Sequence, residues 1–304
     1  MKKRNTKQVI LPLITSFIWG SSFVAQSLGA GKVGGFTFTA ARSIPAVLVL
    51  GALVLILRRV RHEEKYTPQQ KKDLLEGGLV CGIFLTLGTN LQQFGIERTT
   101  AGKAGFITAL YIVLVPIFSI PLKKRPGLAT WVGTAVALVG MYLLCMTEGF
   151  TVSTGDLYVL GCAVCFAVQI MLVDHYSPVV NGVALSCIQF FVAGVLGLIP
   201  ALLLERPAVS AILAAWQPLL FVGVLSCGLA YTFQILAQRD VPAPIASLIM
   251  SLESVFAALA GVLLLNESMS TREAVGCVLM LAAVLLVQLW HPGQRKKPEG
   301  EVRA

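Results

Sequence analysis

The sequence is short of charge and of the motifs that mark most enzymes. Only 13% of its 304 residues are Asp, Glu, Lys or Arg, whereas soluble proteins carry roughly 25%. It has no P-loop, no glycine-rich phosphate cradle and no metal-ligand spacing, so ATP-driven pumping by this chain alone is not expected. The three histidines, His62, His175 and His291, cannot be placed together in one site. We therefore expect no enzyme and no cofactor.

Cysteine is present, but without a pattern that predicts a metal or redox site. All seven cysteines fall inside apolar runs: Cys81, Cys145, Cys162, Cys165, Cys187, Cys227 and Cys277. Cys162 and Cys165 have the CxxC spacing, but no second pair or histidine cluster accompanies them. On a helix they are expected to be small packing residues.

Long apolar runs are what the sequence has instead. A run of about twenty apolar residues is long enough to cross a ~30 Å hydrocarbon core as a helix. Ten such runs are found, at 9–28, 36–57, 75–95, 104–122, 128–147, 156–173, 183–203, 213–235, 243–265 and 271–290. The first is long for a signal peptide and is expected to be retained. The chain is therefore predicted to be an all-α polytopic membrane protein with ten transmembrane helices.

The net charge of +9 is distributed as the positive-inside rule requires. With the N-terminus inside, the inner segments hold 18 Lys and Arg residues and the outer loops hold 5. This asymmetry predicts a multi-pass protein of the cell membrane with both termini in the cytoplasm, embedded in the lipid bilayer. It also accounts for the basic character of the chain without a nucleic-acid partner.

The two halves of the chain resemble each other. The segment Gln93–Arg98 is echoed by Gln234–Arg239, and similar residues recur at an offset of about 141 to 147, such as Trp19 and Phe166. We expect a first five-helix repeat at 1–148, a second at 149–292, and a basic cytoplasmic tail at 293–304. Because five is odd, the second repeat must enter the membrane from the opposite side, which makes the repeats inverted, as in many secondary transporters.

Three segments carry a family resemblance. The motif Trp19-Gly20-Ser21-Ser22-Phe23, the segment 102–116 (GKAGFITALYIVLVP) and the segment 263–276 (LLLNESMSTREAVG) resemble those of EamA-like proteins in the drug/metabolite transporter superfamily. Asn266 departs from that pattern, since glycine is common there. The resemblance covers both halves and implies export of a small molecule, namely an amino acid, a related metabolite or a drug. It does not identify the substrate.

Two charged residues lie within the predicted spans, near the middle of the membrane: Arg42 and Glu253. An ionisable group at that depth costs a few kcal/mol, about 2.5 to 3.5 on insertion scales, which favours a polar cavity over lipid. Arg42 is predicted to recognise an anionic group through its planar guanidinium. Alternatively, Arg42 pairs with a helix carbonyl or with Glu253 and only holds the bundle together.

Uncharged polar and aromatic residues complete the predicted cavity. Asn90 and Gln93 share one helix face, and Tyr231 and Gln234 repeat that spacing in the second half. The full set of predicted substrate-binding residues is Trp19, Arg42, Asn90, Gln93, Tyr111, Gln169, Gln189, Tyr231, Gln234 and Glu253. The alternative for the amides is hydrogen bonding between packed spans, and for Trp19 and Tyr111 it is core packing.

Energy coupling and the rival functions stay open at this level. Glu253 is a candidate carrier of a coupling proton, but exchange or facilitated diffusion fits the sequence equally well. Pro45, Pro116 and Pro200 are expected to bend their helices. The rival functions are an integral membrane enzyme acting on a lipid-linked substrate and a non-transporting scaffold or receptor. The first would need clustered catalytic residues at one interface, which the loops lack.

Overall fold

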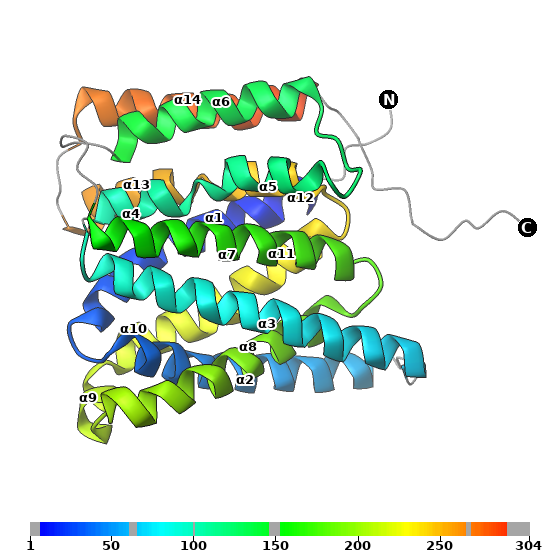
Figure 1. Cartoon of the computed structure of the whole chain (residues 1–304), viewed down its shortest axis with the longest axis vertical. Coiled ribbons are helices and arrows are strands. Elements are labelled where there is room, and N and C mark those ends of the chain that lie inside the picture. The colour runs from blue at the N-terminus through cyan, green and yellow to red at the C-terminus, as the bar shows by residue number, and fades with distance from the viewer. Residues whose placement is uncertain (1–6, 61–65, 100, 146–152, 266–268, 291–304) are drawn as a thin grey trace, which may run out of the picture.

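The computed structural model describes residues 7–60, 66–99, 101–145, 153–265 and 269–290, and all regular elements within these ranges are helical (Figure 1). The elements are α1 (Lys7–Ala30), α2 (Gly35–Val60), α3 (Pro68–Ile96), α4 (Ala101–Thr108), α5 (Tyr111–Ser119), α6 (Leu128–Cys145), α7 (Thr154–Tyr176), α8 (Gly182–Pro200), η1 (Ala201–Glu205), α9 (Val209–Ala214), α10 (Trp216–Phe221), η2 (Val222–Ala230), α11 (Tyr231–Gln238), α12 (Ala243–Met250), α13 (Glu253–Leu265) and α14 (Thr271–Trp290). The predicted tail at 293–304, the segment 266–268, His62 and His291 lie outside the described residues.

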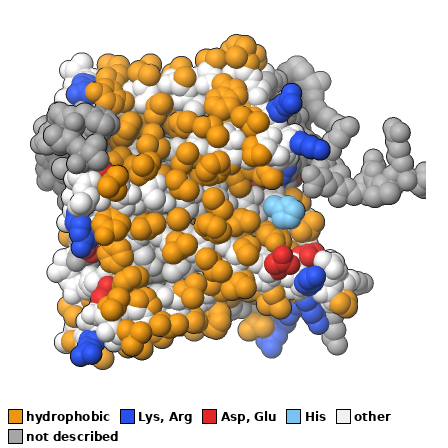
Figure 2. Space-filling view, viewed as in Figure 1, with side chains coloured by type: hydrophobic (Ala, Val, Ile, Leu, Met, Phe, Trp, Pro, Cys, Tyr) orange, Lys and Arg blue, Asp and Glu red, His pale blue; other side chains and the backbone are white. Residues whose placement is uncertain are grey.

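The described helices include the apolar stretches that a polytopic membrane protein needs. Nine stretches of the described chain are long and apolar enough to span a membrane, and a tenth, shorter apolar helical stretch covers Ala104–Ser119. Figure 2 shows apolar side chains over the middle of the visible face and charged side chains toward the two edges where the helices end. Leu48, Leu263 and Leu289 are among the large apolar side chains that the structure leaves exposed. The prediction of an all-α polytopic membrane protein is confirmed.

Local sequence explains where several helices begin. Thr67 and Gln70 form a capping box at the start of α3, with Pro68 at its first position, and Ser153 and Asp156 do the same for α7. Each box satisfies backbone N–H groups that the first turn leaves without partners. Asn181 caps α8 through its side-chain oxygen, which accepts hydrogen bonds from the backbone amides of Val183 and Ala184.

Two other helices are capped by carboxylates that come from distant parts of the chain. Glu205, at the end of η1, accepts hydrogen bonds from the backbone amides of Phe36 and Thr37 in the first turn of α2, at 3.0 and 2.8 Å. Asp174, near the end of α7, accepts from the Ala243 amide at 3.1 Å, at the start of α12. The carboxylates therefore tie spans together at their ends, where backbone N–H groups would otherwise be unpaired.

The fourth and ninth spans are each broken near the middle, which the sequence did not predict. Span four divides into α4 and α5 at 109–110, and span nine into α12 and α13 at 251–252. At both breaks the backbone bonds shift from i−4 to i−3 acceptors, as in a 3₁₀ turn, and they do so at matching positions. The Leu110 and Ile112 amides donate to the carbonyls of Ile107 and Ala109, and Leu252 and Ser254 donate to Ile249 and Ser251.

None of Pro45, Pro116 and Pro200 lies at these two breaks. Pro45 lies within continuous α2, and Pro116 lies within α5, beyond the break in its span. Of the three prolines, Pro200 lies where the helix becomes irregular, since α8 is followed there by the π-helical turn η1.

A serine lies at the break in span nine. The Ser251 hydroxyl donates a hydrogen bond to the Leu248 carbonyl of its own helix, a type of contact that bends helices.

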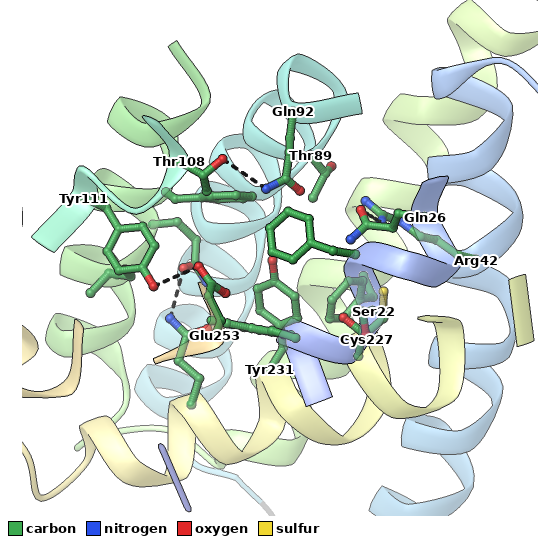
Figure 3. Close-up of a pocket in the computed structure, with 18 residues that line it drawn as sticks. Ser22, Gln26, Arg42, Thr89, Gln92, Thr108, Tyr111, Cys227, Tyr231 and Glu253 are labelled. Atoms are coloured by element: carbon green, nitrogen blue, oxygen red, sulfur yellow. Dashed lines mark hydrogen bonds between the residues drawn. The ribbon is translucent and has the colours of Figure 1, made fainter. Parts of the chain in front are cut away.

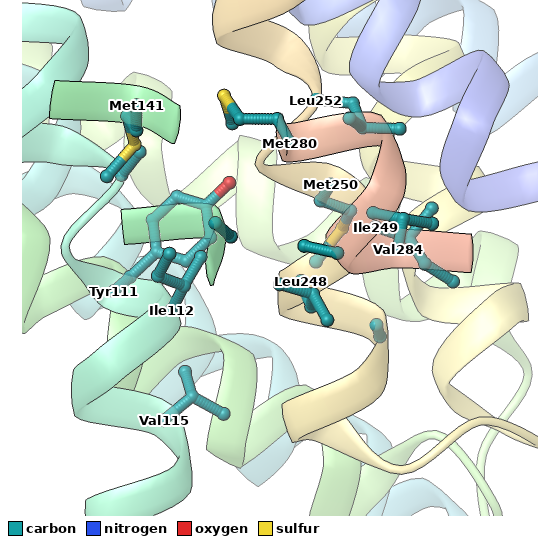
Figure 4. Packing of buried hydrophobic residues seen from close by; sticks show 14 of the residues in the cluster. Tyr111, Ile112, Val115, Met141, Leu248, Ile249, Met250, Leu252, Met280 and Val284 are labelled. Atoms are coloured by element: carbon teal, nitrogen blue, oxygen red, sulfur yellow. The ribbon is translucent and has the colours of Figure 1, made fainter. Parts of the chain in front are cut away.

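The largest hydrophobic cluster joins spans four, five, six, nine and ten, and Figure 4 shows part of it. Its core includes Ile112, Met141, Ile249 and Met280, all at most 1% exposed. Within this cluster α6 and α14 pack closely, because Gly140 faces Gly276 across the contact. A Cβ on Gly140 would lie 2.8 Å from the Gly276 carbonyl oxygen, so glycine is required for that approach.

Candidate functional site

A buried cavity of about 50 Å³ lies between the two halves of the bundle. Eight of the ten spans line it, and neither α6 nor α14 contributes a residue. Its lining consists of Trp19, Ser22, Phe23, Gln26, Arg42, Thr89, Gln92, Thr108, Tyr111, Phe166, Gln169, Ile170, Phe190, Ser226, Cys227, Tyr231, Gln234 and Glu253. The mixture of charged, amide, hydroxyl and aromatic groups is typical of a small-molecule site.

The structure brings seven of the ten predicted site residues to this cavity: Trp19, Arg42, Tyr111, Gln169, Tyr231, Gln234 and Glu253. Asn90, Gln93 and Gln189 are buried but do not belong to the lining. Asn90 donates to the Thr86 carbonyl within its own helix at 2.8 Å, and Gln189 accepts from Gln169 at 3.4 Å, one layer behind the cavity wall. For Gln189, the alternative of bonding between packed spans therefore describes its position.

In span three, the residues that line the cavity are one position earlier than the predicted pair Asn90 and Gln93. Tyr111 and Glu253, 142 residues apart, are hydrogen-bonded partners that each follow the break in their span. The same offset of 142 relates Tyr231 and Gln234 to Thr89 and Gln92, which do line the cavity. The offset of 141 that pairs them with Asn90 and Gln93 is one residue short, and one residue turns a helical side chain by about 100°.

Spans one and six contribute matching residues at a longer offset. Trp19, Ser22 and Phe23 of α1 line the cavity, and so do Phe166, Gln169 and Ile170 of α7, each 147 positions later. The i, i+3, i+4 spacing places each trio on one helix face. The recurrence of Trp19 as Phe166 could have identified Phe166 from the sequence. Ser22, part of the motif at residues 19–23, also lies in the lining.

Arg42 enters the cavity from α2. It is 5% exposed, and its Nη1 donates to the amide oxygen of Gln26 at 3.2 Å. The guanidinium carbon also lies 5.5 Å from the centre of the Phe38 ring. Among the described residues, no carboxylate oxygen lies within 4.0 Å of Arg42. The expected alternative of an Arg42–Glu253 ion pair is therefore wrong.

Glu253 is the first residue of α13 and enters the cavity from the opposite side (Figure 3). It is also 5% exposed, and its Oε1 accepts a hydrogen bond from Tyr111 Oη at 3.1 Å. Figure 3 shows Tyr231 between this pair and the Arg42–Gln26 pair. The two opposite charges thus line one cavity without touching each other.

Amide and aromatic side chains form the rest of the wall. Gln234 donates to Gln169 at 3.2 Å, and the Tyr231 ring packs against those of Trp19 and Phe190, with centroids 4.7 and 5.2 Å away. Two buried polar atoms of lining residues have no partner among the described residues: Trp19 Nε1, a donor, and Gln234 Oε1, an acceptor. Such atoms are costly to leave unpaired, so they favour a polar occupant.

The described residues contain no group of three or more His, Cys, Asp and Glu that could hold a metal. All seven cysteines are free thiols. Cys227 lines the cavity and so does more than fill the core, whereas Cys162 is fully buried beside it. The lining itself offers two charged side chains, several hydrogen-bonding groups and aromatic rings.

An all-helical membrane fold with a polar internal cavity between two similar halves characterises several transporter families. The EamA-like transporter family matches this chain twice, at residues 6–146 and 153–289, and the chain belongs to that family. An uncharacterized transporter from Archaeoglobus fulgidus is 30% identical over 277 residues, covering 91% of this chain and 84% of that protein.

A relative with a more specific name is the threonine/homoserine exporter RhtA of Escherichia coli K12. It is 27% identical over 286 residues, covering 90% of this chain and 88% of that protein. A solved crystal structure superposes with a TM-score of 0.76 at 19% identity, covering 95% of this chain and 98% of the other, which shows a shared fold. The relatives named here as transporters place this chain among membrane transporters.

Proposed function

We propose that this protein is a secondary transporter of the cell membrane that exports a small metabolite through the cavity by alternating access. The substrate class is an amino acid, a related compound or a drug. The single observation that carries this proposal is the paired lining, in which residues from matching spans of both halves face one polar cavity. A site shared by two similar halves can open to either side as the halves exchange conformations.

The proposal requires the two repeats to be inverted, and the contacts favour this. The backbone bonds at the breaks of spans four and nine recur with one offset, so the two halves share an unusual local structure as well as a span count. In Figure 1, α1 begins and α14 ends on the same side of the molecule, as an even number of crossings demands. We take that side to be the cytoplasm, because the basic loops are assigned to it.

The broken spans supply a means of opening. Alternating access requires the cavity to open in turn to each side of the membrane, so part of its wall must move. The 3₁₀ turns at 109–110 and 251–252 flank the lining residues Tyr111 and Glu253, where a small backbone adjustment would move the wall.

The relatives narrow the choice of first substrates. Because RhtA is named for threonine and homoserine, these two amino acids head the panel of compounds. A proton carried by Glu253 is one candidate for coupling, and substrate exchange is the other. A pH jump across the membrane of proteoliposomes distinguishes proton antiport from substrate exchange. In proton antiport, substrate movement is accompanied by proton movement in the opposite direction, whereas substrate exchange moves no protons.

Cysteine accessibility tests alternating access directly. A single cysteine at Thr89, placed in a variant without native cysteines, is expected to react with membrane-impermeant thiol reagents added from either side of oriented vesicles. Reaction from one side alone, whatever substrate is present, would contradict the proposal. A cysteine at Gly51, with no atom within 4 Å of its Cβ position and outside the lining, serves as the control.

A further inference from the structure

The two charges in the cavity are of opposite sign and lie apart. Arg42 and Glu253 are each 5% exposed, and each has one neutral hydrogen-bond partner, Gln26 for the arginine and Tyr111 for the glutamate. Neither forms an ion pair with a described residue. A charge removed from water is stabilised well only when an opposite charge and further hydrogen bonds face it.

The arginine end fits a planar anion. A guanidinium has five N–H donors in a fixed fork, and one amide oxygen at 3.2 Å uses only part of that capacity. A carboxylate can accept two parallel hydrogen bonds from such a fork. The backbone of Arg42 packs tightly against Gly223 of η2, where a Cβ would lie 2.6 Å from the Arg42 carbonyl oxygen.

The glutamate end fits an N–H cation. Tyr111 occupies one oxygen of Glu253, at 3.1 Å, and a carboxylate can accept several hydrogen bonds in all. An ammonium group carries three donors and no acceptor, so it complements the remaining carboxylate capacity. The Tyr231 ring lies between the two ends (Figure 3), and the lining also includes Trp19 and Gln234, whose Nε1 and Oε1 atoms have no partner among the described residues.

We propose that the cavity selects dipolar molecules, with the substrate's carboxylate at Arg42 and its ammonium group at Glu253. This inference rests on the proposed function, because it names the substrate class of the same cavity. A substrate with both charges satisfies both side chains at once and leaves the net charge of the cavity unchanged. An amine or an acid alone would leave one buried charge unpaired, at a cost that weakens its binding.

The test uses two triads of compounds in a counterflow assay, which needs no ion gradient. One triad is L-threonine with 1-amino-2-propanol and 3-hydroxybutyrate, which lack the carboxylate and the amine respectively. The other is 5-aminopentanoate with pentylamine and pentanoate, in which the charges are farther apart. The wild-type protein is expected to exchange at least one dipolar compound roughly 10- to 100-fold faster than either of its single-charge analogues, as charged hydrogen bonds imply.

The variants Arg42→Gln and Glu253→Gln then test the two ends separately. Arg42→Gln is expected to abolish the preference for the dipolar compound over its amine, and Glu253→Gln the preference over its acid. Thr134→Val, which changes a buried polar residue of α6 outside the lining, serves as the control and should keep both preferences. Folding of each Gln variant is judged by its elution in size-exclusion chromatography and by its thermal midpoint. If either variant fails to fold, the comparison of the two triads on the wild-type protein still tests the inference.

Three results would overturn the inference. They are equal exchange of a dipolar compound and its single-charge analogues, unchanged preferences in both folded Gln variants, and no exchange of any dipolar compound in either triad. The last result leaves the proposed function to be judged by a separate measurement, the two-sided accessibility of a cysteine at Thr89. Failure of the substrate class and failure of transport are therefore distinguishable.

Discussion

Replacing Gly20 with alanine should both destabilise the protein and impair its cavity. Gly20 lies in α1 where that helix crosses the start of α13. A Cβ at this position would lie 2.6 Å from the Glu253 carbonyl oxygen and 2.7 Å from the Ala257 nitrogen. Ordinary contacts of a Cβ are 3.4–4 Å. Because these neighbours are backbone atoms that cannot rotate away, α1 and α13 must separate by close to 1 Å.

Such overpacking costs about 1–3 kcal/mol in a well-packed interior. The residues around Gly20 make the displacement a functional one as well, since Trp19 and Ser22 line the cavity on one side of the crossing and Glu253 lines it on the other. We expect Gly20→Ala to lower the thermal midpoint of the purified protein and to slow counterflow of its substrate.

Two glycine variants serve as controls for this prediction. Gly51→Ala places a Cβ where no atom lies within 4 Å, so helix stability should be unchanged or increase by up to about 1 kcal/mol. Gly276→Ala is as crowded as Gly20→Ala, with a Cβ 2.5 Å from the Gly140 carbonyl oxygen, but α6 and α14 do not line the cavity. It should lower stability and leave substrate affinity unchanged. A Gly20→Ala protein that melts and transports like Gly51→Ala would refute the reasoning.

Two further predictions concern the lining of span three and the contacts of Asp174. In a variant without native cysteines, cysteines at Thr89 and Gln92 should react with a small water-soluble thiol reagent, and those at Asn90 and Gln93 should react more slowly, because only the first pair lines the cavity; the reverse order would restore the offset of 141. Asp174 bonds both Lys124 Nζ, at 3.0 Å, and the Ala243 amide. Asp174→Asn keeps an acceptor for that amide and loses an ion pair whose lysine is 38% exposed, so it should cost at most about 1 kcal/mol. Asp174→Ala removes the ion pair and also the acceptor for the Ala243 amide. It should therefore lower the free energy of unfolding by about 1–3 kcal/mol more than Asp174→Asn does, and equal losses in the two variants would contradict the capping role.

The fold was predictable because the membrane imposes a strong and simple requirement. Each span needs about twenty apolar residues with its backbone bonds satisfied internally, and such runs are visible in any sequence. Helix starts were partly visible too, since Thr67, Pro68 and Gln70 form a capping pattern within four residues. The caps supplied by Glu205 and Asp174 were not, because each carboxylate reaches a helix far away in the sequence.

The site was predictable in its chemistry more than in its register. Arg42 and Glu253 could be identified because a charge within an apolar span demands a polar setting. Choosing between Gln92 and Gln93 required the sequence offset between the two repeats to be correct to one residue. Matching similar residues by eye does not distinguish an offset of 141 from one of 142. A glutamine at a buried helix interface and a glutamine at a cavity wall look alike in the sequence, because both are single amides within an apolar span. The sequence alone could therefore not distinguish Gln189 from Gln234.

The breaks in spans four and nine show why the remainder needed a structure. Neither break is at a glycine or a proline, and 109–110 reads Ala-Leu and 251–252 reads Ser-Leu, residues that a continuous helix accommodates. Their location coincides with a tertiary contact, because the residues immediately after the two breaks, Tyr111 and Glu253, hydrogen-bond to each other at the cavity wall. One hydrogen bond therefore joins the segments that follow the breaks in spans four and nine, one in each half, and one of its partners is the acidic group of the cavity. Any occupant that engages Glu253 acts at the junction of both halves, which is where a transporter of this architecture has to respond to its substrate.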